Sequence, residues 1–198
     1  MSIQKAKYLG KKIDVLDHGF VRIVDWMGED LSIVRNARVS YDAAWRTGDD
    51  VEKDAKLINY LYTHGHNTPF EAVRFTFDVK APIFVFRQWQ RHRTWSYNEV
   101  SARYTAVRPE FYLPSLSNIT TQSEDNKQCR TTAQHPQAEY FQESMYQTNS
   151  YCHREYENMI SMGCPRELAR TVLPVSTYSQ MFASVDLNNL FKLSLIHI

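Results

Sequence analysis

The side chains best suited to chemistry lie close together in residues 88–104, which read QWQRHRTWSYNEVSARY. They supply three guanidinium groups, an imidazole, a carboxylate and a hydroxyl, on Arg91, Arg93, Arg103, His92, Glu99 and Ser101. Guanidinium groups hold anionic oxygens through paired hydrogen bonds, so this pattern predicts a pocket for a phosphate and a base. From composition alone, an arginine- and glutamate-rich turn is also typical of a solvated ion-pair network.

The spacing within this segment predicts two sets of polar side chains that meet at a turn. If the part before Arg91 is helical, Gln88 and Arg91 lie three residues apart and share a face. If the part after the turn is extended, alternate side chains share one face, namely those of Glu99, Ser101 and Arg103. The two sets would then meet near His92 and Arg93.

Hydrophobic periodicity predicts the elements that position this segment. Alternating residues predict strands over residues 12–17, 20–25, 72–79 and 175–184, the first two joined as a hairpin. Helical spacing and capping residues predict helices over residues 31–39, 51–63, 82–91, 137–162 and 165–170, and another from Leu187, with Asp30 and Asp186 as N-caps. The helix over residues 137–162 is expected to carry an apolar stripe that packs in the core or at a subunit interface, formed by Ala138, Phe141, Met145, Cys152, Tyr156 and Met159. Residues 115–136 are polar and aperiodic, which predicts a mobile surface loop.

Length and composition fit one globular domain. The chain has 198 residues, 43% apolar and 23% charged, and its formal net charge is +1. That charge gives no reason to expect nucleic acid or an anionic membrane as the main partner, and no apolar run approaches the roughly 18–20 residues of a membrane span. Cys129, Cys152 and Cys164 form no metal-binding pattern, and their odd number predicts a reduced, cytoplasmic chain.

Three elements of the sequence resemble the flavin-dependent thymidylate synthases. Arg91-His92-Arg93, then seven residues and Ser101, is similar to the signature of that family. The element HGHNTPFE at residues 64–71 and the element PRELARTVLP at residues 165–174 are also similar to family elements. The resemblance covers most of residues 12–192, apart from residues 115–136.

The resemblance implies an α+β fold, a single domain with a central, mostly antiparallel sheet flanked by helices. It implies an enzyme that methylates dUMP to dTMP, with 5,10-methylenetetrahydrofolate as the carbon donor and NADPH as the reductant through FAD. The implied partners are these small molecules and further copies of the chain, in a homotetramer with shared active sites. It implies no nucleic-acid partner, no membrane partner and no metal.

Family positions carried over onto this sequence give two sets of expected ligands. The residues expected to hold dUMP are Gln88, Arg91, Glu99, Val100, Ser101, Ala102, Arg103 and Arg170. The residues expected to hold FAD are Ser40, His66, Thr68, Glu71, Arg91, His92, Arg93, Asp186, Asn188 and Lys192. We expect Ser101 to bind dUMP and not to act as a nucleophile, because only His92 lies near it as a base and His92 is expected to bind flavin.

The end of the sequence departs from the family. Residues 191–198 read FKLSLIHI and match no family element, which predicts a truncated or misread C-terminus. The arginine that helps to activate the nucleotide in the family falls at His197, so no catalytic residue is assigned with certainty. We expect the 198-residue chain to keep the flavin and dUMP fold with weak or no turnover.

Two other functions remain open from the sequence. The arginines of residues 87–108 alternate with aromatic residues that could stack bases in a nucleic-acid-binding module, namely Trp89, Trp95, Tyr97 and Tyr104. The chain could also be a non-catalytic assembly subunit that takes up no flavin. A flavin spectrum would argue for the enzyme, and a steep salt dependence of oligonucleotide affinity would argue for the module.

Overall fold

A five-stranded antiparallel sheet forms the centre of the fold, with strands in the order β1-β2-β3-β7-β4. The computed structural model describes residues 7–195. The strands are β1 (Lys12–Val15), β2 (Gly19–Met27), β3 (Arg74–Pro82), β4 (Ser96–Glu99) and β7 (Tyr178–Asp186). The sheet and its flanking helices confirm the expected fold class, and the predicted hairpin is β1 and β2.

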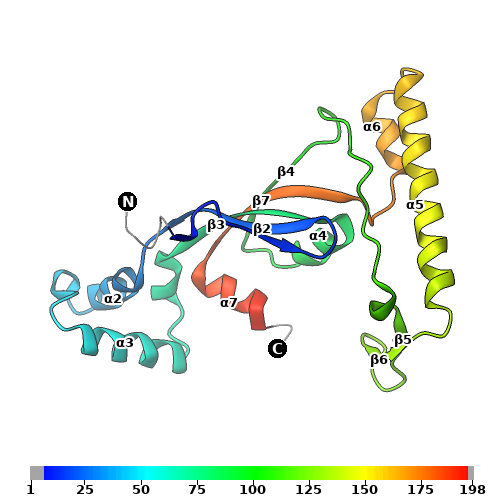
Figure 1. Cartoon of the computed structure of the whole chain (residues 1–198). Helices are drawn as coiled ribbons and strands as arrows, with labels where there is room; N and C mark the ends of the chain where they lie inside the picture. The colour runs from blue at the N-terminus through cyan, green and yellow to red at the C-terminus, as the bar shows by residue number, and fades with distance from the viewer. Residues whose placement is uncertain (1–6, 196–198) are drawn as a thin grey trace.

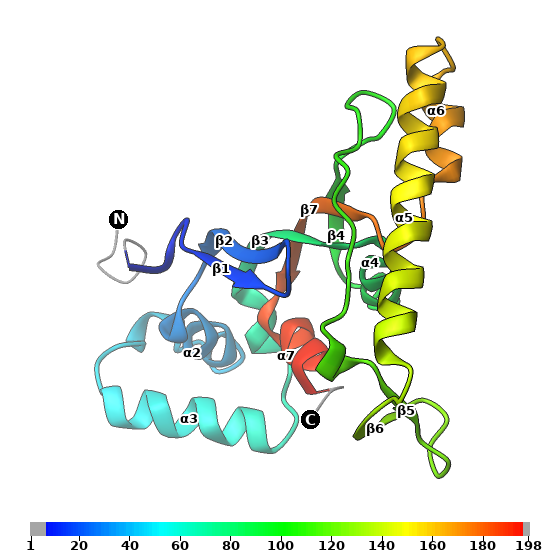
Figure 2. The ribbon, with the colours of Figure 1, turned by 45° about the vertical axis from the view of Figure 1, so that its right-hand side comes forward.

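Helices lie at both ends of the sheet and against it (Figures 1 and 2). At one end are α2 (Asp30–Val39) and α3 (Val51–Thr63), and at the other are α5 (Ala138–Ser161) and α6 (Arg166–Ala169). The short α4 (Ile83–Trp89) follows β3 directly, and α7 (Leu187–Leu195) lies beneath the sheet in Figure 1. Single 3₁₀ turns are η1 (Ala44–Arg46), η2 (Thr68–Ala72), η3 (Leu116–Asn118) and η4 (Arg170–Val172). Among residues 7–195, no helix combines the length and apolar character needed to span a bilayer.

Two apolar clusters hold these elements together, and α7 joins them. The first lies on the sheet under α4 and contains Val79, Phe86, Trp95, Met181, Ala183 and Val185. The second lies between α2, α3 and η2 and contains Ile33, Leu61, Phe70 and Val73. Helix α7 packs Leu190 and Leu193 on the first cluster and Leu187 and Phe191 on the second. Its position therefore depends on both.

The capping predictions for α2 and α7 have different outcomes. Asp186 caps α7 as predicted, because its Oδ1 accepts a hydrogen bond from the backbone N–H of Asn189 at 2.9 Å. The prediction that Asp30 caps α2 is wrong. The N-cap is Glu29, whose backbone N–H donates to Ser32 Oγ at 3.1 Å, so Asp30 lies inside the first turn, where its negative charge favours the helix dipole.

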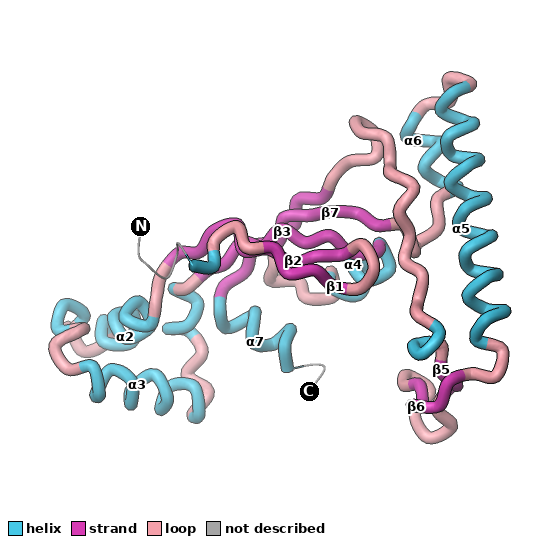
Figure 3. Tube along the Cα trace, in the orientation of Figure 1, coloured by secondary structure: helices cyan, strands magenta, loops and turns pink. Residues whose placement is uncertain are grey.

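Residues 115–136 form more structure than their composition indicates. The expected surface loop contains regular structure, because β5 (Thr120–Gln122) and β6 (Arg130–Gln134) pair as an antiparallel hairpin. Polar cross-strand bonds replace the missing apolar alternation. Thr121 and Thr131 share a hydroxyl hydrogen bond at 2.6 Å, and Gln122 Nε2 donates to the carbonyl of Cys129 at 2.6 Å. Figure 3 shows the long irregular segment that leads from β4 to this hairpin.

The buried face of α5 contains two members of the expected stripe, Ala138 and Tyr156, and two polar residues that the stripe did not include, Asn149 and His153. Met145, another member of the stripe, is 43% exposed, which leaves it free for a subunit interface. Polar groups at this depth need hydrogen-bond partners, and the partners come from segments far away in the sequence.

A carboxylate buried in the sheet ties three strands together. Asp78 on β3 is fully buried. One of its oxygens accepts a short hydrogen bond from the Arg22 guanidinium on β2, and the other accepts one from Gln180 Nε2 on β7 at 2.7 Å. Asp78 does lie on the face opposite Val79, as the alternation predicts, but these neighbours cover it.

We predict that Arg22→Met lowers the free energy of unfolding by about 3 kcal/mol, because it leaves a buried carboxylate without its cation. Urea denaturation measures this loss. The matched control is Lys12→Met, which breaks the exposed Lys12–Asp14 pair on the neighbouring strand and should change stability by less than about 0.5 kcal/mol. Equal losses in the two variants would show that the buried pair contributes no more than a surface pair.

Candidate functional site

A tyrosine on β4 holds the turn after α4 through hydrogen bonds to its backbone. Tyr97 on β4 donates its hydroxyl to the carbonyls of Trp89 and His92, each at 3.1 Å. Burial raises the pKa of Tyr97 to about 12, so the hydroxyl stays protonated and able to donate. These bonds hold the end of α4 and fix the turn that carries Arg91, His92 and Arg93.

The aromatic residues around this turn belong mainly to the core. Trp95 is only 6% exposed, and Trp89 and Tyr97 pack on the same apolar cluster. The rings of Trp89 and Trp95 meet edge to face with centroids 5.2 Å apart. Of the four rings considered for base stacking, only Tyr104, at 75% exposed, lies open to solvent. The arrangement therefore does not supply the stacking platform of a nucleic-acid-binding module.

The extended segment after the turn is shorter than its spacing suggests. Strand β4 ends at Glu99, whose Oε1 accepts a hydrogen bond from Ser179 Oγ at 2.6 Å, and Val100 N–H donates to Gln180 O at 2.9 Å. The chain then turns, with the carbonyl of Ser101 accepting from the backbone N–H groups of Tyr104 and Thr105. Arg103 therefore lies in a turn and not on a strand.

A cavity of about 990 Å³ opens beside this turn, between α4, β7, η4 and the loop after β4. It brings together six of the eight residues expected to hold dUMP: Glu99, Val100, Ser101, Ala102, Arg103 and Arg170. It does not include Gln88 or Arg91. The face of α4 that lines it carries Ile83, Phe86, Arg87 and Gln90 at helical spacing.

The cavity is rich in unpaired positive charge. Four arginines line it, Arg87, Arg103, Arg108 and Arg170, and none of them forms an ion pair within the described residues. A fifth cation, Lys80, pairs with Glu110 at 2.6 Å. Guanidinium groups that form no ion pair remain available to bind an anion through paired hydrogen bonds. Sequence reasoning missed Arg87 and Arg108, although the i, i+3 relation of Arg87 to Gln90 could have indicated a shared face.

The hairpin turn between β1 and β2 holds another wall of the cavity. Tyr178 lines the cavity, and its hydroxyl donates a short hydrogen bond to Asp17, which also accepts from Leu113 N–H at 3.1 Å. Burial works to raise the pKa of Asp17, but these bonds outweigh it and hold that pKa below its usual value. The turn needs glycine at position 19, since a Cβ there would lie 2.6 Å from Val15 O and 2.9 Å from Lys80 O.

A second cavity, of about 720 Å³, lies between α2, α3 and η2. It brings together three of the residues expected to hold FAD, namely Ser40, His66 and Thr68. The Tyr60 and His66 rings stack with centroids 5.9 Å apart. Arg38 lines the same cavity, but its guanidinium pairs with Asp54 at 2.5 Å. An aromatic shelf beside hydroxyl groups fits part of a ligand that has a flat ring system, as FAD has.

The other residues expected to hold FAD form two further groups. Around the start of α7, Asn188 Nδ2 donates to Glu71 at 3.3 Å and Lys192 Nζ donates to Asn189 at 3.1 Å. Asp186 uses both oxygens to accept from Asn189. Arg91, His92 and Arg93 stay together on the turn after α4 and line neither cavity. His197, the position of the family's activating arginine, lies outside the described residues.

The sequence and structure of this chain match known proteins. The family described as "Thymidylate synthase complementing protein" matches residues 22–196. A flavin-dependent thymidylate synthase of Treponema denticola is 45% identical over 185 residues, which cover 92% of this chain and 68% of that protein. The chain belongs to this family. The flavin-dependent thymidylate synthase of Ehrlichia ruminantium (strain Gardel) is 43% identical over 183 residues, and there the chain spans 61% of the relative's length.

A solved structure similar to this chain supports the fold. The crystal structure of PolB from Streptomyces cacaoi, a UMP/dUMP methylase bound with 5-Br dUMP, has 35% identity and a TM-score of 0.80. The superposition covers 90% of this chain and 77% of that one. The family match and the curated relatives confirm the resemblance to flavin-dependent thymidylate synthases, while the roles of individual residues stay predictions. In residues 7–195 no group of three or more His, Cys, Asp and Glu residues could hold a metal ion.

A buried histidine contacts the residue that precedes β7 in the wall of the first cavity. His153 on α5 is 3% exposed, and its Nε2 lies 3.3 Å from the hydroxyl of Thr177, which lines the cavity. Burial lowers the pKa of His153, and the nearby Glu157 carboxylate opposes this only in part. The imidazole is therefore held neutral in the folded chain at pH values where an exposed histidine already takes up a proton.

We predict that acid destabilises the fold through His153. The unfolded chain binds a proton at this site near pH 6.5 and the folded chain only at lower pH, so stability falls as the pH drops below about 6.5. Thermal melting between about pH 7.5 and pH 5.5 measures the slope. His153→Gln should flatten it, whereas His64→Gln, at an exposed position, serves as the control. Equal slopes in wild type and His153→Gln would contradict the assignment.

Proposed function

We propose that the chain binds dUMP and FAD and serves the methylation of dUMP to dTMP, with 5,10-methylenetetrahydrofolate as the carbon donor and NADPH as the reductant. The observation that carries this proposal is the cavity whose four arginines have no ion pair among the described residues. Membership in a family whose curated relatives are named flavin-dependent thymidylate synthases supports the reaction class. PolB, the structural neighbour with bound 5-Br dUMP, supports the nucleotide.

The chemistry of the cavity suits a nucleoside monophosphate. The phosphate carries close to two negative charges at neutral pH, and guanidinium groups bind such oxygens in pairs. Arg103 and Arg170 would hold the phosphate, and Glu99 and Ser101 would offer an acceptor and a hydroxyl to the sugar and base. Ser101 Oγ already accepts from Arg103 N–H at 3.3 Å, an arrangement suited to binding. None of the three cysteines lines the cavity, so a thiolate mechanism has no nucleophile there.

The flavin would be held by groups on separate elements. Ser40, His66 and Thr68 would contact one part of it at the second cavity, and Asn188, Lys192 and Glu71 would contact another from α7 and η2. Bound FAD would supply the hydride transfer that the reaction requires. Arg91, His92 and Arg93, held on the turn by Tyr97, would place positive charge near it. Because these groups lie apart on one chain, the proposal needs more than one subunit to complete each site.

Association of several copies is part of the proposal. The chain has an accessible surface of 13830 Å², whereas a compact monomer of 23.3 kDa exposes roughly 9,700 Å². Gln88 and Arg91 are exposed and lie off the cavity of their own chain, where they could reach a neighbour's nucleotide in a homotetramer. All three cysteines are free, which suits a reducing compartment such as the cytoplasm.

We predict that dUMP binds to the purified chain and that Arg103→Lys weakens its affinity about tenfold or more, because a lysine cannot form the paired contacts. Isothermal titration calorimetry gives the dissociation constant. Arg154→Lys, an exposed change on α5 away from the cavity, should leave it unchanged.

The visible spectrum distinguishes the proposal from its alternatives. Flavin bands that shift when dUMP is added would support both sites. A colourless protein that cannot be loaded with FAD, and that binds oligonucleotides with a steep salt dependence but not dUMP, would overturn the proposal in favour of a nucleic-acid-binding role.

A further inference from the structure

The loop that follows β4 lines much of the nucleotide cavity without belonging to a helix or strand. Residues 101–110 contain a turn at residues 102–104 and otherwise no regular structure. Two of the four unpaired arginines, Arg103 and Arg108, come from this loop. Where these guanidinium groups lie therefore depends on what holds the loop.

Backbone hydrogen bonds to β7 hold the two ends of the loop. Val100 N–H donates to Gln180 O at 2.9 Å, and Tyr178 N–H donates to Glu110 O at 2.9 Å. Between these ends, one hydrogen bond joins residues 101–109 to any other part of the described chain. It runs from Val107 N–H to the hydroxyl of Tyr156 at 3.1 Å. The other hydrogen bonds of this stretch stay within the loop.

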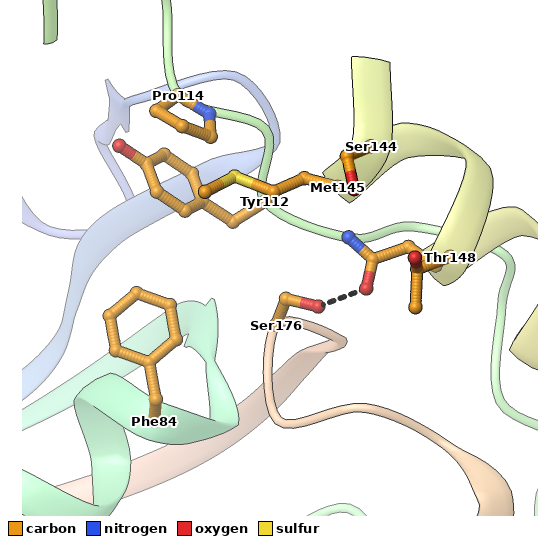
Figure 4. Close-up of a pocket in the computed structure, with 8 residues that line it drawn as sticks. Phe84, Tyr112, Pro114, Ser144, Met145, Thr148 and Ser176 are labelled. Carbon is orange, nitrogen blue, oxygen red and sulfur yellow. Dashed lines mark hydrogen bonds between the residues drawn. The ribbon is translucent and has the colours of Figure 1, made fainter. Parts of the chain in front are cut away.

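Tyr156 is held rigidly, because it is one of three buried polar residues on one face of α5. Tyr156 is 1% exposed, His153 3% and Asn149 7%. Asn149 accepts a hydrogen bond from Ser176 at 2.8 Å, marked by the dashed line in Figure 4, and His153 meets Thr177 at 3.3 Å. One face of α5 thus contacts both the loop after β4 and the segment that leads into β7.

The turn that carries Arg170 belongs to the same assembly. Helix α5 contacts both α6 and η4, and Ala169, directly before Arg170, is fully buried. Arginines from the loop and from η4 are therefore placed relative to each other through α5. Backbone bonds to β7 hold the two ends of the loop at Val100 and Glu110, but not its middle.

We infer that Tyr156 is a positioning residue for nucleotide binding, whose hydroxyl holds the loop so that its arginines face the cavity. This inference rests on the proposed binding of dUMP. Without the hydroxyl, Val107 N–H loses its partner, and the middle of the loop is attached only through its ends. The arginines then have more positions available and lose entropy when a phosphate orders them, so affinity falls although no contact to the nucleotide has been removed.

The test compares Tyr156→Phe with Tyr151→Phe, a 55% exposed tyrosine on the same helix. We expect the dissociation constant for dUMP to rise about fivefold or more in Tyr156→Phe and to stay unchanged in Tyr151→Phe. Hydrogen exchange of a peptide covering residues 101–109 should be faster only in Tyr156→Phe. Retention of FAD, measured by absorbance, should be the same in both.

A third variant separates positioning from general loss of stability. Ile33→Val removes a methyl group from the apolar cluster at the other end of the fold, so it lowers stability without touching the loop. It should leave the dissociation constant for dUMP unchanged. If Tyr156→Phe loses stability but binds dUMP as wild type does, the inference is wrong while the proposed function stands. If the wild type itself binds no dUMP, both are wrong.

Discussion

The fold depends on a negative charge that has no access to water. Asp78 lies in the middle strand of the sheet and is fully buried, so its two oxygens must be satisfied by neighbouring strands. Arg22 and Gln180 supply the partners from β2 and β7. Hydrogen bonds of this kind require one register and one strand order, because a slip of one residue would turn the carboxylate to the other face. Gln180 also lines the cavity of about 990 Å³, so the same interaction that fixes the sheet fixes part of the candidate site.

The cavity itself is built from two kinds of support. One wall, with Tyr178 and Ser179, belongs to β7 and is held by the sheet. The other walls, which carry Arg103, Arg108 and Arg170, are loop and turn segments that rest on α5. A scaffold that fixes these backbones independently of a ligand would preorganise the cavity for the anion that we propose it binds.

Local sequence patterns predicted the elements well, and long-range contacts account for the misses. The helix over residues 51–63 was predictable because its apolar periodicity agrees with the glycine at position 65, which stops it. The face of α4 that lines the cavity was not predictable. Gln90 lines the cavity and Gln88 does not, and this depends on where the sheet lies relative to the helix. Likewise, buried polar residues of α5 find their partners in the distant segment that leads into β7. The sequence of α5 alone therefore cannot predict which of its polar residues are buried.

The strand order has a consequence for how the chain is made. Strand β7 follows the other strands of the sheet in sequence, yet it lies between β3 and β4. A growing chain that has not reached residue 178 therefore exposes the full edge of β3, with its unpaired backbone groups and the apolar side chains of Phe77 and Val79. Such an edge can pair with strands of other chains. Covering it requires β3 to pair with β7 about a hundred residues later in the sequence, and contacts of such long range form slowly. We therefore expect the growing chain to be prone to aggregation until β7 has been synthesised and has paired with β3.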